Sequence, residues 1–330
     1  VSEGLTQVGG TKTGYAMLQS FLSERGENYR VGMSSPITAE HACSRLSPHL
    51  SVGTVSIRDA WQLSQYQREM YKAIGERSRF VASLKSFGSR LHWHCHFMQK
   101  LESEPRLEFE ALHRGFIGLR EPSEISSERF DRFATAQLGW PFVDACLRCL
   151  KSTGWINFRM RAMLVSIASY HLWIDWRLTA GLLASWFTDF EAGIHFSQVQ
   201  MQSGITGINA NRIYSPIKQS EEHDPEGIFI RRWLPELSAL PTEWIHTPWR
   251  MPHSLQLKLG VVIGLKYPDP IGDPIQMARE ARARMGDWIH KHDLKAEAQR
   301  VLKVHGSRSR QLRPRYNKKD PDKQLVMNLK

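Results

Sequence analysis

Apolar residues recur every three or four positions along most of the chain, which is the spacing of amphipathic helices. The pattern predicts one helix over residues 15–25, with glycine-containing loops on both sides. It continues with few breakers through residues 55–101, and a proline- and serine-rich interruption at 121–127 follows. Residues 131–186 carry Ala, Leu, Met and Trp at helical intervals and are nearly free of proline, so we expect two or three core helices there.

Strand signals are almost absent from the pattern. Alternation of apolar and polar residues is confined to residues 260–265, and there is neither a β-α-β rhythm nor an internal repeat. We therefore expect an all-α fold, with one helical domain over residues 1–300 and a basic tail over residues 301–330. Such a tail either contacts DNA or is simply solvated. Its basic residues include Arg308, Arg310, Arg313, Arg315, Lys318 and Lys319.

Composition narrows the class of protein. The 330 residues are 41% hydrophobic and 23% charged, as in globular proteins, and no run of about eighteen apolar residues suggests a membrane span. Four cysteines without a secretory leader favour a reduced cytoplasmic or nuclear setting without disulfides. The net charge of +11 is typical of a protein with a polyanionic partner, although a purely solubilising charge is the alternative.

A serine-rich turn precedes a predicted helix at residues 43–53. Small hydroxyl side chains and free backbone N–H groups at such a turn favour a bound phosphate, and the helix dipole adds to this preference. The same pattern is also typical of an ordinary helix N-cap. Taken alone, the turn leaves both interpretations open.

Two groups of potential metal ligands do not have the geometry of a metal site. Residues 92–96 hold three histidines and a cysteine, but on a helix only His92 and His96 share a face. Cys146 and Cys149 lie one helical turn apart, yet no later cysteine exists to complete the four thiolates of an iron–sulfur cluster. We therefore expect no metal.

Several motifs occur in a fixed order from residue 139 onward. Gly139 and Trp140 come first, Arg159 and Arg161 follow, and an Asp-Trp-Arg triplet stands at 175–177. Further motifs lie at 214–219, 224–237 and 267–273. Together these segments resemble the flavin domain of the DNA photolyase/cryptochrome family.

The resemblance covers residues 9 to 300 and implies a helical domain around a bound FAD. It does not cover the N-terminal α/β antenna domain of most members, so the chain is either a short form or lacks a domain that was removed. It implies a monomeric enzyme that repairs pyrimidine dimers in DNA with light. A blue-light photoreceptor without repair activity is the alternative. The histidine pair of enzymes for the other major ultraviolet photoproduct is replaced by Asn157, Phe158 and Ala162, which favours the cyclobutane dimer.

The resemblance also assigns site residues. Ser44, Leu46 and Ser47 match positions around the flavin's pyrophosphate and ribityl chain, and Arg161 and Asp189 match an ion pair beside the isoalloxazine ring. Trp93 and Trp155 match aromatic positions near the substrate cavity, and Trp176 matches the middle member of an electron path. The remaining cofactor-binding positions are Tyr29, Cys43, Arg45, His94, Phe158, Glu191, Ile194 and His195.

Three departures from the family pattern stand out. His195 occupies the position facing flavin N5, where asparagine, aspartate or cysteine is usual, and a histidine there is expected to titrate near neutrality and to donate a proton or a hydrogen bond. Val199 and Met201 replace tryptophans, so the electron path is incomplete, with Trp173 and Trp186 as an alternative route. Arg90 replaces a glutamate that commonly contacts the lesion.

Overall fold

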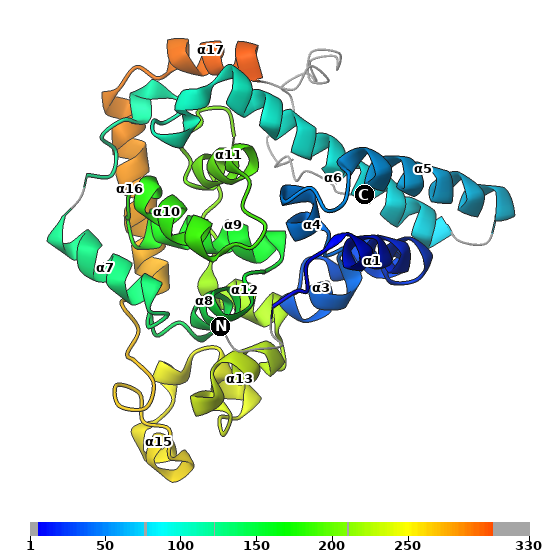
Figure 1. Cartoon of the computed structure of the whole chain (residues 1–330). Coiled ribbons are helices and arrows are strands. Elements are labelled where there is room, and N and C mark those ends of the chain that lie inside the picture. Colours follow the sequence, from blue (N-terminus) through cyan, green and yellow to red (C-terminus); the bar gives the residue numbers. More distant parts are fainter. Residues whose placement is uncertain (1–5, 76–77, 122, 210, 306–330) are drawn as a thin grey trace, which may run out of the picture.

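The computed structural model describes residues 6–75, 78–121, 123–209 and 211–305, and these segments form helices joined by irregular connections (Figure 1). Across these segments there is no strand, and one isolated bridge joins Ile263 to Tyr267. The prediction of an all-α fold is confirmed. The weak alternation at 260–265 forms a turn, because Gly260 and Gly264 both have positive φ angles.

The first third of the chain forms one group of helices, coloured blue to cyan in Figure 1. Its members are α1 (Thr11–Ser23), η1 (Arg25–Asn28), α2 (Tyr29–Gly32), α3 (Pro36–Ala42), α4 (Ser47–Ser51), α5 (Ile57–Ile74) and α6 (Ser78–Ser103). Their apolar faces meet in a core that includes Phe21, Phe80, Leu84 and Phe87. This core is separate from the larger one that the following helices enclose.

The larger core lies under the helices of the middle and last parts of the chain. The α-helices among them are α7 (Glu124–Ala134), α8 (Pro141–Thr153), α9 (Phe158–Ser166), α10 (Trp176–Trp186), α11 (Ala192–Gln202), α12 (Pro216–His223), α13 (Ile228–Trp233), α14 (Thr242–Ile245), α15 (His253–Leu259), α16 (Pro274–Lys291) and α17 (Lys295–His305). Short helical turns connect them: η2 (Pro105–Glu108), η3 (Arg114–Phe116), η5 (Pro235–Leu237), η6 (Pro248–Arg250) and the π-helical η4 (Ile167–His171).

The expected helices are present, with boundaries set by local chemistry. The helix predicted over residues 15–25 is α1, which starts earlier, directly after Gly10 with its φ of 97°. The block 55–101 contains α5 and α6, because Gly75 adopts the left-handed conformation that ends α5. At the other end of α5, the Ser56 side chain accepts the N–H of Asp59 as an N-cap.

Helix α6 connects the two halves of the molecule, since its C-terminal part packs directly on α11. Gly193 makes the close approach possible at the start of α11. A Cβ atom on Gly193 would lie 2.7 Å from the carbonyl oxygen of Phe97 on α6. Any larger residue at position 193 must therefore push the two helices apart.

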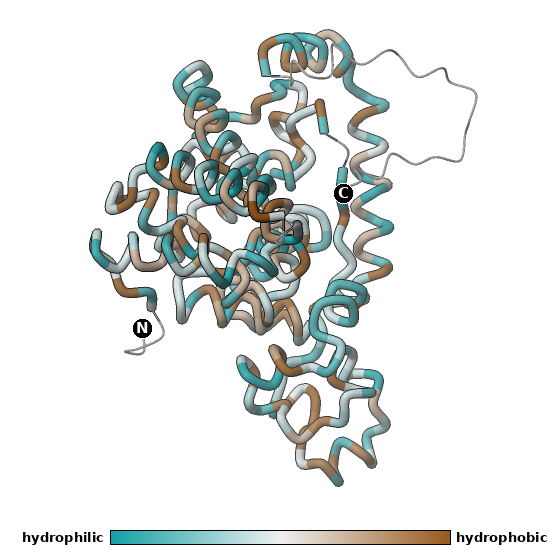
Figure 2. Tube along the Cα trace, turned by 90° about the vertical axis from the view of Figure 1, so that its right-hand side faces the viewer, coloured by the Kyte–Doolittle hydropathy of each residue, from teal (hydrophilic) through white to brown (hydrophobic). Residues whose placement is uncertain are grey.

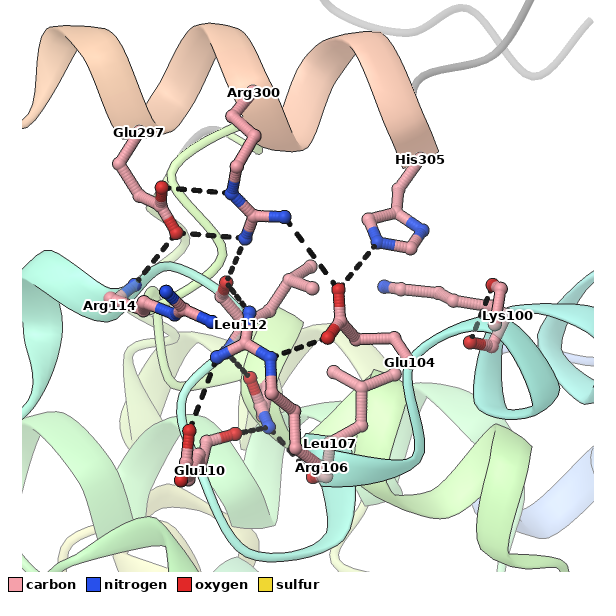
Figure 3. A network of polar contacts seen from close by, with 12 residues as sticks. Lys100, Glu104, Arg106, Leu107, Glu110, Leu112, Arg114, Glu297, Arg300 and His305 are labelled. Atoms are coloured by element: carbon pink, nitrogen blue, oxygen red, sulfur yellow. Dashed lines mark hydrogen bonds and ion pairs between the residues drawn. The ribbon is translucent and has the colours of Figure 1, made fainter.

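The last described helix, α17, lies over the end of α6 and the segment that follows it (Figure 3). Val301 of α17 is buried with Leu107 and Leu112 in a small apolar cluster. Beside this cluster, the Glu104 carboxylate forms an ion pair with Arg106. It also lies 3.7 Å from Arg300 Nη1 and 3.4 Å from His305 Nε2. Because α17 continues to His305, it crosses the expected domain boundary at residue 300, and the rest of the predicted basic tail lies outside the described residues.

Hydrophobic and hydrophilic residues alternate along the long helices at the edge of the molecule in Figure 2, as in amphipathic helices. Among the described residues, no helix combines the length and the apolar character needed to cross a bilayer.

Candidate functional site

A buried ion pair joins α9 to the loop between α10 and α11. Arg161 donates from Nη1 to Asp189 Oδ1 at 2.9 Å and from Nη2 to Oδ2 at 2.8 Å, and the Asp189 side chain is only 2% exposed. The Nε of Arg161 donates to the Ile156 carbonyl oxygen at 2.7 Å, and the ring of Phe187 lies 4.2 Å from the guanidinium carbon. This two-pronged, charge-assisted geometry fixes the orientation of both side chains.

His195 lies beside this pair on α11, enclosed by the rings of Phe187, Phe190 and Phe196. Burial, the main cause, and the charge of Arg161 lower its pKa, while the hydrogen bond to the Ala180 carbonyl and the charge of Asp189 oppose the shift, and the net pKa is about 4. The expectation that His195 titrates near neutrality is therefore wrong for this structure. Aromatic rings have replaced the water that would otherwise stabilise an imidazolium ion.

One hydrogen bond decides which ring nitrogen of His195 carries the proton. The Nε2 atom lies 2.9 Å from the Ala180 carbonyl oxygen, which can only accept, so Nε2 is the donor. In the neutral ring Nδ1 then holds a lone pair. His195 is consequently an acceptor at Nδ1, and its one ring proton is committed to the Ala180 carbonyl, so the expected donation of a proton or a hydrogen bond to the flavin does not fit the neutral ring.

A second polar contact links α6 to the start of α11. His94 Nε2 lies 2.8 Å from a carboxylate oxygen of Glu191, and both side chains are largely buried. Ile194, half-buried, follows on the first turn of α11. The contact brings two predicted cofactor residues, distant in the sequence, to within one hydrogen bond of each other.

The serine-rich turn lies between α3 and α4 and contains a residue in an unusual conformation. Arg45 has a φ of 61°, which is rare for a residue with a side chain and costs conformational energy. Gln7 Nε2 donates to the Arg45 carbonyl oxygen at 2.7 Å. Leu46 is fully buried, and its N–H points to the Ser44 hydroxyl at 3.4 Å, while Ser47 begins α4.

Arg25 stabilises this turn, although no sequence pattern pointed to it. Its guanidinium donates to the carbonyl oxygens of Cys43 at 2.7 Å, His41 at 3.0 Å and Ser44 at 3.2 Å. With these carbonyls held on one side, the turn is fixed in a single shape. Only a tertiary contact shows this role, because a single arginine after a helix has no distinctive sequence pattern.

The turn and the buried ion pair lie within electrostatic reach of each other. Burial raises the pKa of the Cys43 thiol to about 11, while the charges of Arg45, Arg25 and Arg161 oppose that rise. Burial lowers the pKa of Arg45, and Asp189 is among the groups that oppose this. The two predicted parts of the site therefore converge on one region, and its surplus of arginines suits an anionic cofactor.

The predicted aromatic positions differ in accessibility. Trp93 on α6 is 40% exposed, and Phe158 at the start of α9 is 52% exposed. Trp155 is only 8% exposed, and the Arg45 guanidinium carbon lies 3.9 Å above its ring. Trp93 and Phe158 therefore keep exposed surface for stacking, although the Arg90 guanidinium carbon lies 4.5 Å over the Trp93 ring, whereas Trp155 is almost fully enclosed.

The tryptophans of the expected electron path are set in unequal surroundings. Trp176 is buried in the larger core together with Val199, while Met201 is half-buried. Trp173, on the alternative route, lies under Arg120 at 4.8 Å and Arg284 at 5.2 Å. Two nearby cations oppose the formation of a tryptophan radical cation, so this environment disfavours Trp173 as an electron donor.

Within the described part of the chain, no group of three or more His, Cys, Asp or Glu residues could hold a metal ion. The charged groups that do converge are those that suit a flavin dinucleotide. The positive charge of Arg25 and Arg45 beside the turn is compatible with phosphates, even though the Arg25 N–H groups already bind carbonyl oxygens, and the Arg161–Asp189 pair with neutral His195 forms a buried polar patch compatible with a ring system. The donor set therefore fits the cofactor that the motifs imply.

Comparison with known proteins gives a consistent result. Residues 87–287 match the family model described as the FAD binding domain of DNA photolyase. A cryptochrome DASH of Gloeobacter violaceus is 29% identical over 86% of this chain and 56% of its own length. A deoxyribodipyrimidine photo-lyase of Vibrio cholerae is 32% identical over 72% of this chain and 49% of its own.

Solved structures agree with the sequence relatives. A bacterial class III photolyase from Agrobacterium tumefaciens superimposes with a TM-score of 0.76 at 27% identity, covering 84% of this chain and 56% of that protein. A cryptochrome from Synechocystis gives a TM-score of 0.74 at 28% identity, with the same coverage. The chain thus spans about half the length of the relatives it matches.

Proposed function

Because this chain belongs to the FAD-binding family of the DNA photolyases and cryptochromes, we propose that it is a light-driven enzyme that repairs pyrimidine dimers of the cyclobutane type in DNA. The relatives include both repair enzymes and cryptochromes at similar identity. The choice between these activities therefore rests on the site itself.

The observation that carries the proposal is the combination of open aromatic rings with the buried charged site. Trp93 directly precedes His94, which bonds to Glu191, and Phe158 lies one helical turn before Arg161. Exposed rings are what a protein needs to stack an extruded base, and the net charge of +11 suits a phosphate backbone. Repair requires both features.

The chain's own groups have limited tasks in this reaction. A flavin held at this site would, in its excited reduced form, supply the electron needed to open the dimer. Arg161 provides positive charge near the reduced ring, and Asp189 keeps that charge in place. Neutral His195 presents the Nδ1 lone pair as an acceptor, and Trp93 positions the lesion. Because the electron returns after splitting, no general acid is required.

A repair assay tests the proposal. The purified protein is incubated with a DNA oligonucleotide that carries one cyclobutane thymine dimer, in blue light and in darkness, and dimer loss is measured by chromatography. We expect repair only in light and a several-fold loss of repair in Trp93→Ala. An Ile289→Ala variant, with a half-exposed side chain on α16, serves as the surface control. Absence of repair from protein with full flavin content would refute the proposal.

A photoreceptor without repair activity is the second candidate, and one observation favours it. Val199 is 2% exposed and packed in the larger core, so no aromatic ring stands where the family's electron path begins. Relatives named cryptochrome include one from Arabidopsis thaliana, 31% identical over 81% of this chain and 43% of its own length. Flavin photoreduction without dimer loss in the same assay would favour this candidate.

A further inference from the structure

A cavity of about 170 Å³ lies at the start of α10, and none of the residues that line it is a predicted cofactor-binding residue. Its walls come from the segment between η2 and α7, from the first residues of α10 and from the loop after α11. Phe116, Trp176 and Ile205 supply apolar surface, and each of them is 7% exposed or less. Because an apolar cavity of about 150 Å³ holds a benzene ring, this cavity has room for one aromatic ring.

Arg120, also in the cavity wall, is a buried cation without a counter-ion. The residue is 4% exposed, and its guanidinium donates from Nε to the Ser169 carbonyl oxygen at 2.7 Å and from Nη2 to the Ser203 carbonyl oxygen at 3.0 Å. Burial lowers its pKa to about 10, which still leaves it charged at neutral pH, while Tyr170 and Asp175 oppose the shift. Within the described part of the chain, no carboxylate pairs with Arg120 and no hydrogen-bond partner meets Nη1. A buried charge in this state is costly unless an anion joins it.

The other charged residues of the cavity wall already have partners. Asp175 accepts from Arg177 Nε at 3.0 Å and from Arg177 Nη2 at 2.7 Å, so these two charges cancel. Glu110 pairs with Arg106 Nη1 at 3.2 Å. Among the described residues that line the cavity, Arg120 therefore carries the one charge without an opposite partner. The cavity combines room for a ring with a surplus of one positive charge.

We propose that this cavity binds a small aromatic carboxylate, with its ring among Phe116, Trp176 and Ile205 and its carboxylate at Arg120. A guanidinium is the protein group best matched to a carboxylate, and the pairing gains strength where water is excluded. Phe109 and Ile117 also line the cavity and are 67% and 56% exposed, so an apolar surface lies at its open side. The proposal depends neither on flavin binding nor on repair.

Three small probes separate the contributions of the ring and of the charge. Benzoate has both, benzyl alcohol keeps the ring without the charge, and acetate keeps the charge without the ring. In calorimetric titrations of the protein as purified, we expect benzoate to bind with a Kd of about 1 mM or tighter. The other two probes should bind at least about tenfold more weakly, since each lacks one of the two contributions. No heat of binding with benzoate at about 10 mM, or equal affinity for benzoate and benzyl alcohol, would overturn the proposal.

Two substitutions at the neighbouring ion pair should change the affinity for benzoate in opposite directions. Arg177→Gln leaves the Asp175 carboxylate unpaired in the wall, so benzoate should bind about threefold more weakly. Asp175→Asn keeps an N-cap side chain on α10 but frees the Arg177 guanidinium, so benzoate should bind about threefold more tightly. A merely structural effect would weaken binding in both variants, and that result, or no change in either, would place benzoate outside this cavity.

A matched control and a direct test of Arg120 complete the experiment. Arg232→Gln breaks a comparable ion pair, to Glu40 at 2.9 Å, at a residue that does not line the cavity, and it should leave benzoate affinity unchanged. Arg120→Met should abolish the preference for benzoate over benzyl alcohol. A preference that persists in folded Arg120→Met would refute the role of this residue. Where that variant does not fold, the opposite shifts at positions 175 and 177 decide the matter.

Discussion

At the scale of single residues, burial determines what His195 can do. Its ring is 8% exposed, its Nε2 proton is committed to the Ala180 carbonyl, and its pKa is about 4. At neutral pH it is therefore a fixed hydrogen-bond acceptor and not a proton donor. If His195 faces the flavin as proposed, its Nδ1 lone pair is suited to accept a hydrogen bond from a group that carries a hydrogen, such as N5 of a reduced flavin.

The shifted pKa of His195 predicts a loss of stability in acid. Because its pKa in the folded protein lies below the ordinary value of about 6.5, the unfolded chain binds the proton more tightly, and stability present above pH 6.5 is lost as the pH falls toward 4. Between pH 7.5 and pH 5, the wild type should lose about 2 kcal/mol more than His195→Gln. Urea unfolding at both pH values measures this difference. Equal losses in the two proteins would show that the ring stays hydrated.

At the scale of elements, the contact between α6 and α11 positions the site. His94 and Glu191 bond across it, and His195 follows one turn later on α11. Gly193 allows the two helices to approach because it has no Cβ atom. The polar contacts therefore form only when the backbones of α6 and α11 pack closely. A change in that packing should affect several site residues together.

Two glycines allow a matched test of this packing. In Gly193→Ala the new methyl group meets the Phe97 carbonyl oxygen, so we expect a loss of stability of about 1–3 kcal/mol and a lower flavin content. In Gly181→Ala on α10 no atom lies within 4 Å of the new Cβ, so this variant should gain up to about 1 kcal/mol from higher helix propensity. Denaturant unfolding and the ratio of flavin to protein absorbance give both results. Similar stability in the two variants would contradict the close packing.

Helix α17 depends on the carboxylate of Glu104 (Figure 3). Glu104 lies among Arg106, Arg300 and His305, with Lys100 nearby, and burial lowers the pKa of Lys100 to about 8 while Glu104 opposes this shift. Glu104→Gln keeps the size of the side chain but removes the negative charge that Arg106, Arg300 and Lys100 share, while His305, whose pKa burial lowers, loses only a hydrogen-bond acceptor.

We expect Glu104→Gln to release α17 locally while the larger core stays folded. Hydrogen exchange of residues 295–305 should become at least about tenfold faster, the change that corresponds to about 1.4 kcal/mol of local opening. Glu110→Gln is the control, because Glu110 pairs only with Arg106 and has a 53% exposed side chain. If α17 exchanges at the wild-type rate in Glu104→Gln, its apolar contacts alone hold it.

At the scale of the whole molecule, the sequence predicted those features that depend on residues close together along the chain. Helical periodicity indicated the fold class, and the ordered motifs indicated the family and its cofactor. They could not predict the contacts of Arg25 with the serine-rich turn or of Arg45 with Trp155. These contacts join residues that are far apart in the sequence and share no recognisable motif. The tautomer and pKa of His195 were missed for the same reason: both depend on Ala180 and on a ring of phenylalanines that only the fold assembles.

Net charge is the other property of the whole molecule, and it is unevenly distributed. Residues 306–330 contain eight Lys or Arg and two Asp or Glu, a net +6 of the chain's +11. Each basic residue that binds a phosphate releases condensed counterions, so the salt dependence of DNA binding reports how many phosphates the protein neutralises. These residues lie outside the described part of the chain, but the effect of their charge on DNA binding can be measured without knowing their structure.

We predict that removal of residues 306–330 weakens binding to DNA and makes it less sensitive to salt. If the segment binds phosphates, the slope of log affinity against log salt concentration should fall by about 0.9 for each phosphate that the truncated chain no longer neutralises on duplex DNA. Flavin content and the preference for dimer-containing over intact DNA should not change, since the site residues lie before residue 306. Fluorescence anisotropy at several salt concentrations measures both slopes. Parallel lines for the full and truncated chains would mean that these charges only solvate the chain, leaving the helical domain to bind the phosphates.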